Sequence, residues 1–185
     1  MLAYILWHWP FAEVQTRHYE SSLVEFHQSL TKSTIPGFMK SIIFRSRGAP
    51  WLGSGERGYE DWYLLDGSAA IDLLNEAAVS TASKLPHDTT AHAAAGAAAG
   101  LYQLQKGAPA GSACRFASWL VKPSGTSYEE FYASVQPWTS QPEVSLWRRQ
   151  MVLGPTPEFG VFSPRQLELP SNLLTVSVEL ELVGP

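Results

Sequence analysis

Hydrophobic residues in the first part of the chain follow two different spacings. Residues 2–9 are apolar on both alternating sides and end at Pro10, which is typical of a strand buried on both faces. Between residues 13 and 33 the apolar positions recur at i, i+4, i+7 and i+11, which predicts a helix with one apolar side. That side consists of Tyr19, Leu23, Phe26 and Leu30. The patterns that follow predict strands over 38–45 and 59–65, helices over 69–80 and 87–100, and a strand over 101–105.

The same order of elements recurs in the second part of the chain. A strand over 114–123 ends in proline, and Phe131, Val135 and Trp138 then repeat the helical spacing. Two further strands, a reduced helix interrupted by Pro170 and a clearly alternating strand over 173–183 complete the series. We therefore expect an α+β protein with two ferredoxin-like β-α-β-β-α-β repeats, over 1–107 and 113–185, that share one core. Because the first strands are apolar on both faces, we expect the antiparallel sheets to pack face to face as an intramolecular α/β barrel.

Composition narrows the classes of partner. The 185 residues are 45% hydrophobic and 16% charged, with seven Trp, seven Tyr and eight Phe, which indicates a globular chain with a large aromatic core. A net charge of −4 argues against nucleic acid as a partner. The chain has one cysteine, no leader-like start and no apolar run of about 18 residues, so we expect a cytoplasmic protein that does not enter membranes. The outer face of the predicted helices is rich in alanine, which would allow a second copy of the chain to pack there, so a homo-oligomer is a possible assembly.

The segment "HYESSLVEFHQSL…IPGF" carries a resemblance to a known family. With the order of elements, it resembles the dimeric α/β-barrel superfamily, which includes EthD-type proteins and small cofactor-independent monooxygenases. In EthD-type sequences the first helix carries two aromatic residues and a histidine at the positions held here by Tyr19, Leu23 and His27. The resemblance implies a ligand cavity between helices and sheet, a small apolar or aromatic ligand, and His27 as a ligand-binding residue. Some members bind haem through a helix histidine, but the sequence selects none of its five histidines for that role.

Candidate catalytic residues lie on the first and third strands. His8 shares a strand face with Tyr4, while Tyr59, Asp61 and Tyr63 share a face of their own strand. If these faces meet, Asp61 can fix the tautomer of His8, which makes His8, Asp61 and Tyr59 candidate catalytic groups and Tyr4 and Tyr63 candidate ligand contacts. The alternative is a structural histidine that hydrogen-bonds inside the core.

Two arginines and one loop are further candidates. Arg45 and Arg148 occupy corresponding strands of the two repeats and could bind a ligand carboxylate, or they could be solvated strand ends. Trp51 and Leu52 lie in a glycine-rich loop and are expected to be exposed, as a lid or a subunit contact. No nucleotide-binding glycine motif and no His-Glu-x-x-His is present, so we expect neither a cofactor nor a metal.

These residues leave two functional hypotheses. One is a small-molecule-binding or assembly protein whose cavity is filled by its own tryptophan and phenylalanine side chains. The alternative is a cofactor-independent monooxygenase or isomerase that acts on an aromatic or polyketide-like substrate. The catalytic hypothesis requires a carboxylate within about 6 Å of His8 and a cavity of about 300 Å³ or more beside it.

Overall fold

Eight strands of the described residues form one closed antiparallel barrel. The computed structural model describes residues 1–52, 58–109, 111–151 and 156–185, and around the barrel the strands follow the order β1-β3-β2-β8-β5-β7-β6-β4. The strands are β1 (Leu2–Pro10), β2 (Phe38–Arg47), β3 (Gly58–Leu65), β4 (Ala94–Lys106), β5 (Phe116–Leu120), β6 (Ser145–Arg149), β7 (Phe159–Ser163) and β8 (Leu174–Gly184). The predicted α+β class and the predicted barrel are confirmed.

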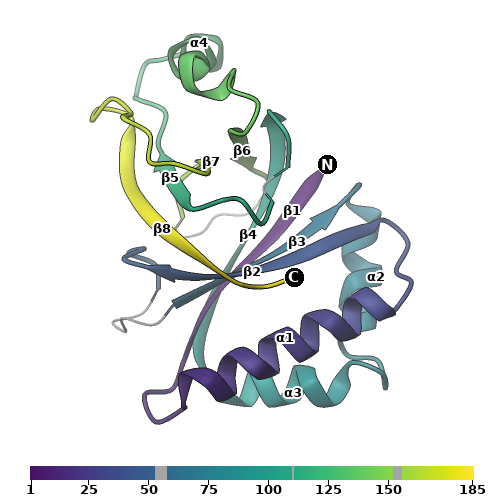
Figure 1. Cartoon of the computed structure of the whole chain (residues 1–185). Coiled ribbons are helices and arrows are strands. Elements are labelled where there is room, and N and C mark those ends of the chain that lie inside the picture. The colour runs from purple at the N-terminus through teal and green to yellow at the C-terminus, as the bar shows by residue number, and fades with distance from the viewer. Residues whose placement is uncertain (53–57, 110, 152–155) are drawn as a thin grey trace.

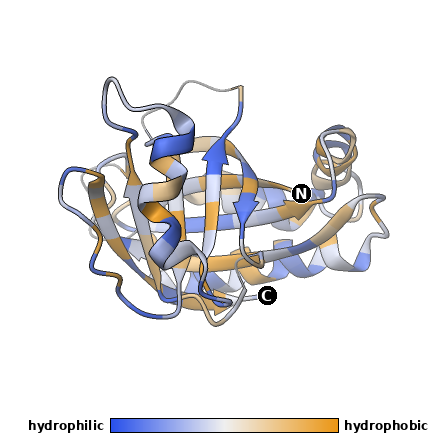
Figure 2. Ribbon diagram, turned by 90° about the horizontal axis from the view of Figure 1, so that it is seen from above, coloured by the Kyte–Doolittle hydropathy of each residue, from blue (hydrophilic) through white to orange (hydrophobic). Residues whose placement is uncertain are grey.

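The helices cover the outside of the barrel in two groups. The structure has α1 (Thr16–Lys32), α2 (Ala69–Ala78), α3 (Lys84–Ala93) and α4 (Tyr128–Thr139). Figure 1 shows α1, α2 and α3 together beneath the first strands, while α4 lies at the opposite end. In Figure 2 hydrophobic residues are concentrated along the strands, and the helices carry hydrophilic stretches. Helices α1, α2 and α4 each bury part of an apolar side, whereas α3 buries no residue and packs mainly against α1.

Large aromatic side chains fill the interior of the barrel. Trp7, Trp62, Trp119 and Trp147 are fully buried, and the rings of Trp7 and Trp119 meet edge to face with centroids 5.4 Å apart. Trp51, from the loop after β2, is 8% exposed and packs edge-on at 5.3 Å from Trp119. The expectation that Trp51 and Leu52 are exposed is therefore wrong. A ring of that size contributes more stability when it closes the barrel interior than when it faces water.

A carboxylate lies among these rings. Glu60 on β3 is fully buried, and its two oxygens accept hydrogen bonds from the indole N–H groups of Trp7 and Trp62, each at 2.8 Å. Burial raises the pKa of Glu60 from its ordinary value of 4.5 to about 7, although both indole hydrogen bonds act in the opposite direction. Glu60 and its neighbour Asp61 point to opposite sides of the same strand, so this interior carboxylate is separate from the site described below.

The structure differs from the predicted elements in the alanine-rich segment. Helix α3 ends at Ala93, and residues 94–100, predicted to be helical, begin the long strand β4. A Cβ on Gly96 would lie 2.4 Å from the ring of Trp9, and one on Gly100 would lie 2.7 Å from the ring of Tyr102. The glycines leave room for large rings beside β4, which a count of alanines does not reveal. The reduced helix predicted around Pro170 is also wrong, because residues 164–173 form a bend, an irregular stretch and a turn.

Candidate functional site

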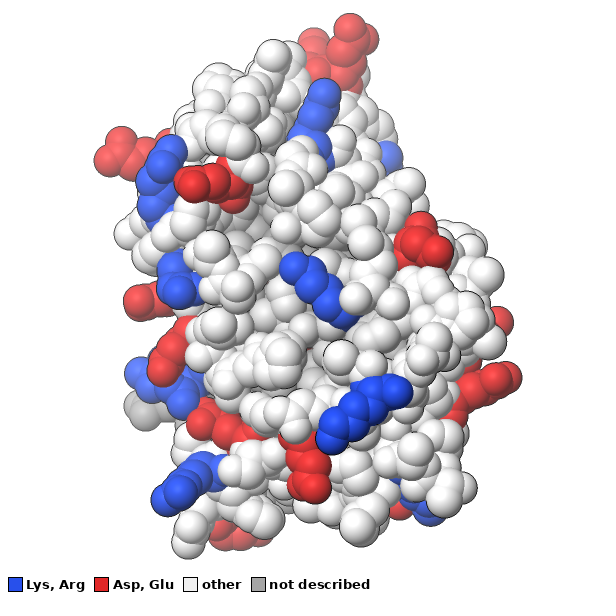
Figure 3. All heavy atoms as spheres, turned by 45° about the vertical axis from the view of Figure 1, so that its right-hand side comes forward, with Lys and Arg blue, Asp and Glu red and all other residues white. Residues whose placement is uncertain are grey.

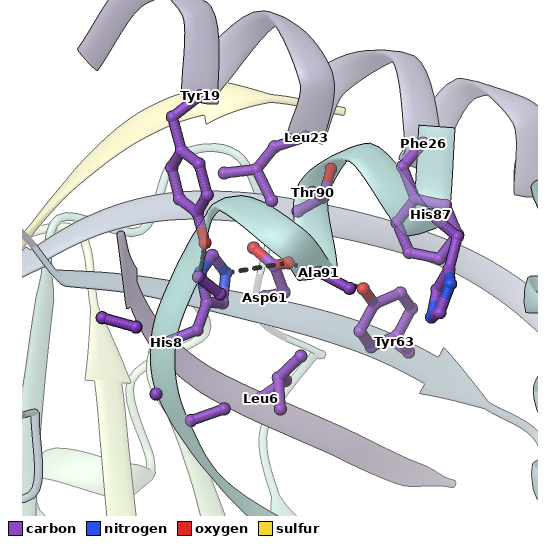
Figure 4. Close-up of a pocket in the computed structure, with 14 residues that line it drawn as sticks. Leu6, His8, Tyr19, Leu23, Phe26, Asp61, Tyr63, His87, Thr90 and Ala91 are labelled. Atoms are coloured by element: carbon purple, nitrogen blue, oxygen red, sulfur yellow. Dashed lines mark hydrogen bonds and ion pairs between the residues drawn. The ribbon is translucent and has the colours of Figure 1, made fainter. Parts of the chain in front are cut away.

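A cavity of about 340 Å³ lies between the first strands and the helices that cover them. Figure 4 shows His8 and Asp61 pointing into it from the sheet, with Tyr19, Leu23 and Thr90 reaching down from the helices. Its walls are mostly apolar, and the polar side chains of His8, Asp61 and Tyr19 lie together at one end, with His87 at the other. The lining residues are Leu6, His8, Tyr19, Leu23, Phe26, Asp61, Tyr63, His87, Thr90, Ala91, Ala94, Ala95, Gly96 and Ala97.

Strand alternation and register bring the polar groups together. On β1, Trp7 faces the barrel interior, so its neighbours Leu6 and His8 face the helices. The antiparallel pairing of β1 with β3 places Leu6 opposite Asp61 and His8 opposite Tyr59. His8 is therefore one diagonal step from Asp61 on the same face, which is within reach of both side chains.

Asp61 is the centre of a buried hydrogen-bonded cluster. Its Oδ2 lies 3.1 Å from His8 Nε2 and 3.1 Å from His27 Nε2. The hydroxyl of Tyr63 is 3.1 Å from the same His27 nitrogen, and the hydroxyl of Tyr19 is 2.7 Å from His8 Nδ1. His8, His27 and Asp61 are all at most 3% exposed, so these interactions take place out of water and are only weakly screened by salt.

The charge state of this cluster follows from its neighbours. Burial alone would raise the pKa of Asp61, but the imidazoles of His8 and His27 more than offset it and hold that pKa below its usual range. Asp61 is therefore a carboxylate. Burial, with the charge of Asp61, raises the pKa of Tyr19 well above its ordinary value, so Tyr19 keeps its hydroxyl proton.

These charges also select the tautomer of His8. A lone pair on Nε2 would face the Asp61 carboxylate, which is unfavourable, so the proton belongs on Nε2. Tyr19 then donates its hydroxyl proton to Nδ1 of a neutral His8. Even in an imidazolium Nε2 still carries a proton, so this nitrogen is a donor in either charge state.

Three buried polar atoms around the cavity lack hydrogen-bond partners among the described residues: His8 Nε2, Asp61 Oδ1 and Thr90 Oγ1. The contact of His8 Nε2 with Asp61 has the distance of an ion pair but not the alignment of a hydrogen bond. Buried polar atoms normally find partners, and each one left without costs about 1–3 kcal/mol. One acceptor, one donor and one hydroxyl thus lie without partners in side chains that line the cavity.

The structure brings most of the predicted first-half residues together. His8, Asp61 and Tyr63 line the cavity, and His27 lies behind Asp61. Tyr59 stacks on His8 with ring centroids 5.5 Å apart and donates its hydroxyl to Glu20, so it supports the imidazole and does not line the cavity. Tyr4 is absent from this lining and lies in the wall of a neighbouring cavity.

The two arginines lie elsewhere, and neither lines the cavity. Arg45 is paired with Glu20, with its Nε 3.0 Å from the carboxylate, and also with Glu181. Arg148 is paired with Glu158 at 3.0 Å and lies 3.9 Å above the ring of Tyr128. Each guanidinium already has a carboxylate partner within the chain, which leaves little capacity for the anion binding suggested by sequence.

Sequence reasoning missed two contributors to the site. The sequence places Tyr19 on the apolar side of its helix and at an aromatic position of the EthD-type pattern, but does not reveal that its hydroxyl hydrogen-bonds to His8. Thr90 also lines the cavity, and the signal for it is a hydroxyl residue in an alanine-rich segment.

Several classes of function find no support in these residues. No group of three or more histidine, cysteine, aspartate or glutamate side chains within the described ranges could hold a metal ion. Among the described helices none is long and apolar enough to cross a membrane. Charges of both signs are interspersed on the face seen in Figure 3, without a broad patch of either sign.

Comparison with known proteins defines the fold. No protein-family model matches the sequence, and no curated protein sequence is similar to it. A "putative monooxygenase" from Fusobacterium nucleatum has a similar structure, with a TM-score of 0.66 and 10% identity over 98% of this chain and 92% of that one. A "putative monooxygenase" from Lactobacillus acidophilus gives a TM-score of 0.55 at 13% identity, again over 98% and 92%. A "putative chlorite dismutase" gives 0.53 at 11% identity, over 98% and 93%. At these identities the similarity shows the fold alone, which is consistent with a dimeric α/β barrel.

Proposed function

We propose that the chain is an enzyme that removes a proton from a neutral, largely apolar molecule bound in the cavity beneath α1 and α3. The observation that carries this proposal is the pair of unpartnered atoms at the polar end, Asp61 Oδ1 and His8 Nε2. A ligand hydroxyl can donate to the first and accept from the second. The same pair suits a ketone with an acidic C–H. Its low pKa makes Asp61 a weak base, and it can take the proton because the His8 N–H stabilises the oxyanion that forms.

Each neighbouring residue has a role in this arrangement. Tyr19 fixes the orientation of the His8 ring through Nδ1, and Tyr59 supports the ring face. His27 holds the other side of Asp61 Oδ2, which leaves Oδ1 toward the ligand. Because the cluster is buried, a developing oxyanion would be stabilised more strongly than in water.

The lining also restricts the charge of the ligand. No lysine or arginine is found among the described residues that line this cavity, and its one carboxylate is Asp61. A ligand carboxylate would face Asp61 without a compensating cation. The site therefore favours neutral phenols, enols and ketones over aromatic acids.

Proton abstraction is the first step of both reactions suggested by the sequence. An isomerase returns the proton to another atom of the same molecule. A cofactor-independent monooxygenase lets the resulting carbanion react with dioxygen, and the names of the two monooxygenase-like structures support that class for this fold. The alternative hypothesis, a binding or assembly protein whose cavity is filled by its own side chains, accounts for the aromatic barrel interior. It does not account for the open cavity beneath the helices.

The test uses anthrone, a neutral tricyclic ketone with an acidic methylene group. Exchange of its C10 protons in deuterated buffer under nitrogen is followed by NMR, and oxygen uptake is then measured in air. We expect the protein to accelerate exchange and Asp61→Asn to lose the acceleration, typically about 100-fold or more for a general base. Tyr19→Phe should lose part of it and provides a second variant if Asp61→Asn does not fold.

Glu60→Gln is the matched control, because Glu60 adjoins Asp61 on β3 but faces the barrel interior. It should leave the exchange rate unchanged below its melting temperature. Exchange that is no faster with the protein than without it, or equally fast with Asp61→Asn, would refute the proposed chemistry. Exchange without oxygen uptake would assign the site to isomerisation, and uptake coupled to exchange would assign it to oxygenation.

We further infer that the chain is a tandem repeat. The order β4-β1-β3-β2 in the first half matches β8-β5-β7-β6 in the second, and the strands and first helix follow the same sequence in each half. The two helices α2 and α3, which precede β4, have no counterpart before β8 among the described residues. Deleting one half should abolish cooperative folding, since the halves share β2–β8 and β4–β6 pairing and one aromatic core.

A further inference from the structure

A second cavity adjoins the first. It has a volume of about 370 Å³ and lies between the sheet, α1 and α2. The two cavities share four lining residues, Leu6, Phe26, Tyr63 and His87, so these side chains form the partition between them. Figure 4 shows Phe26, His87 and Tyr63 together at the end of the first cavity that lies away from His8.

The partition consists largely of packed rings. Phe26 meets His87 edge to face with centroids 5.4 Å apart. The side chain of His87 is 34% exposed and hydrogen-bonds to the adjacent Asp88 on its own helix. His87 is therefore the partly exposed member of the partition, and exposed side chains change rotamer rapidly.

The two cavities differ in chemistry. The unpartnered atoms of His8, Asp61 and Thr90 belong to residues that line the first cavity and not the second. The second is walled mainly by apolar side chains, including Leu30, Ile71, Leu74 and Ala78, with exposed Asp72 and Asn75 on α2. Neither cavity is lined by a lysine or arginine among the described residues. A molecule that filled both would need a hydroxyl-bearing end, an apolar body and no negative charge at its far end.

We infer, building on the proposed function, that the site takes an elongated ligand whose hydroxyl-bearing end lies at Asp61 and whose apolar end passes Phe26 and His87 into the second cavity. The size of the second cavity then limits the length of ligand that the site can bind. Burial of apolar surface there supplies affinity, while Asp61 and His8 fix the reacting end.

The experiment measures binding of neutral 4-alkylphenols by calorimetry, from 4-methylphenol to 4-octylphenol. The para position directs the chain away from the hydroxyl, so each added methylene extends toward the partition. Affinity should rise by up to about fourfold per methylene, which corresponds to about 0.8 kcal/mol, and then level off once the second cavity is full. The stoichiometry should remain one phenol per chain.

Substitutions on α2 test whether the alkyl chain of the phenol lies in the second cavity. Ala78→Phe places a ring in the second cavity and should reduce the affinity for 4-octylphenol to near that for 4-methylphenol, with 4-methylphenol unaffected. Leu73→Phe is the matched control, because Leu73 is on the same helix, 37% exposed and outside the lining. It should change neither affinity. Ile71→Trp serves the same purpose if Ala78→Phe does not fold.

The outcomes separate this inference from the proposed function. If 4-methylphenol binds and Asp61→Asn weakens it, but affinity is independent of chain length or insensitive to Ala78→Phe, the role of the second cavity is refuted and the proposed function stands. If affinity rises with chain length and falls with Ala78→Phe while Asp61→Asn has no effect, the second cavity binds apolar chains and the role of Asp61 is refuted. Absence of binding by every phenol would refute both.

Discussion

Glu60 should make the stability of the barrel fall as pH rises. In the unfolded chain its carboxyl group ionises at the ordinary pKa of 4.5, whereas burial raises the pKa to about 7 in the fold. Between these values the folded state binds the proton more tightly than the unfolded state does. The contribution of Glu60 to stability is therefore fully present below pH 4.5 and is lost as pH rises through about 7.

The magnitude follows from the two pKa values. A rise in the pKa of Glu60 from 4.5 to about 7 changes the free energy of unfolding by roughly 3 kcal/mol in total. About 2–3 kcal/mol of this change occurs between pH 5 and pH 8. Asp61 has the opposite sign, because its pKa is lowered, but its contribution is lost only below its ordinary value of 3.8. The two effects therefore occupy different pH windows.

Urea denaturation at pH 5 and pH 8, followed by tryptophan fluorescence, measures the effect in the wild type and in Glu60→Gln. Glutamine does not titrate, so the wild type should lose about 2–3 kcal/mol more than the variant between these pH values. The variant should also be less stable by about 1–3 kcal/mol at the lower pH, because an amide offers a single acceptor to the two indole N–H groups of Trp7 and Trp62. Parallel pH profiles for the two proteins would show that Glu60 is already ionised in the folded barrel at pH 5, and would refute the reasoning.

Three further substitutions test other parts of the structure. Asp61→Asn should lower the free energy of unfolding by about 3–5 kcal/mol at neutral pH in urea denaturation, because it removes the charge between two buried histidines. A decrease of less than about 1 kcal/mol would contradict a central role of Asp61 in the cluster. Tyr19→Phe should lower the free energy of unfolding by about 1–3 kcal/mol, because His8 Nδ1 loses its 2.7 Å partner; thermal denaturation equal to wild type would argue against that hydrogen bond. Gly107→Ala should destabilise the protein more than Gly48→Ala. Both glycines have positive φ, but a Cβ on Gly107 would lie 2.0 Å from the carbonyl oxygen of Val144, whereas a Cβ on Gly48 would contact nothing within 4 Å. The shared φ penalty is about 1–2 kcal/mol, so equal losses in urea denaturation would contradict the contact.

The elements that carry the site were largely predictable from local patterns. The i, i+4, i+7 spacing identified α1 and its inward side, and strand alternation separated His8 from Trp7 and Trp9. The contact of His8 with Asp61 was a hypothesis only. It depends on the register of β1 against β3, and the register is set by the barrel as a whole and not by either strand.

Other features depended on packing that no local pattern encodes. Trp51 is in a loop by sequence, but the open end of an aromatic-filled barrel gives its ring a buried position. Residues 94–100 have high helix propensity, yet small side chains are what β4 needs beside Trp9 and Trp7. In both cases tertiary packing outweighs the local preference.

The two halves of the barrel use the space beneath their helices differently. In the proposed repeat, His8 corresponds to Val121, since His8 lies two residues before Pro10 at the end of β1 and Val121 lies two residues before Pro123, which follows β5. His8 is 3% exposed and faces a cavity, whereas Val121 is 48% exposed. Beneath α4, Phe131 packs directly on Phe159 with ring centroids 4.2 Å apart, so this space holds a compact apolar cluster. A buried polar cluster lowers stability unless every member is satisfied, and the first half retains His8, His27 and Asp61 with atoms unsatisfied. This loss of stability has a physical reason if a ligand supplies the missing hydrogen bonds. We therefore expect the function to lie in the first half of the chain, and the second half to stabilise the barrel.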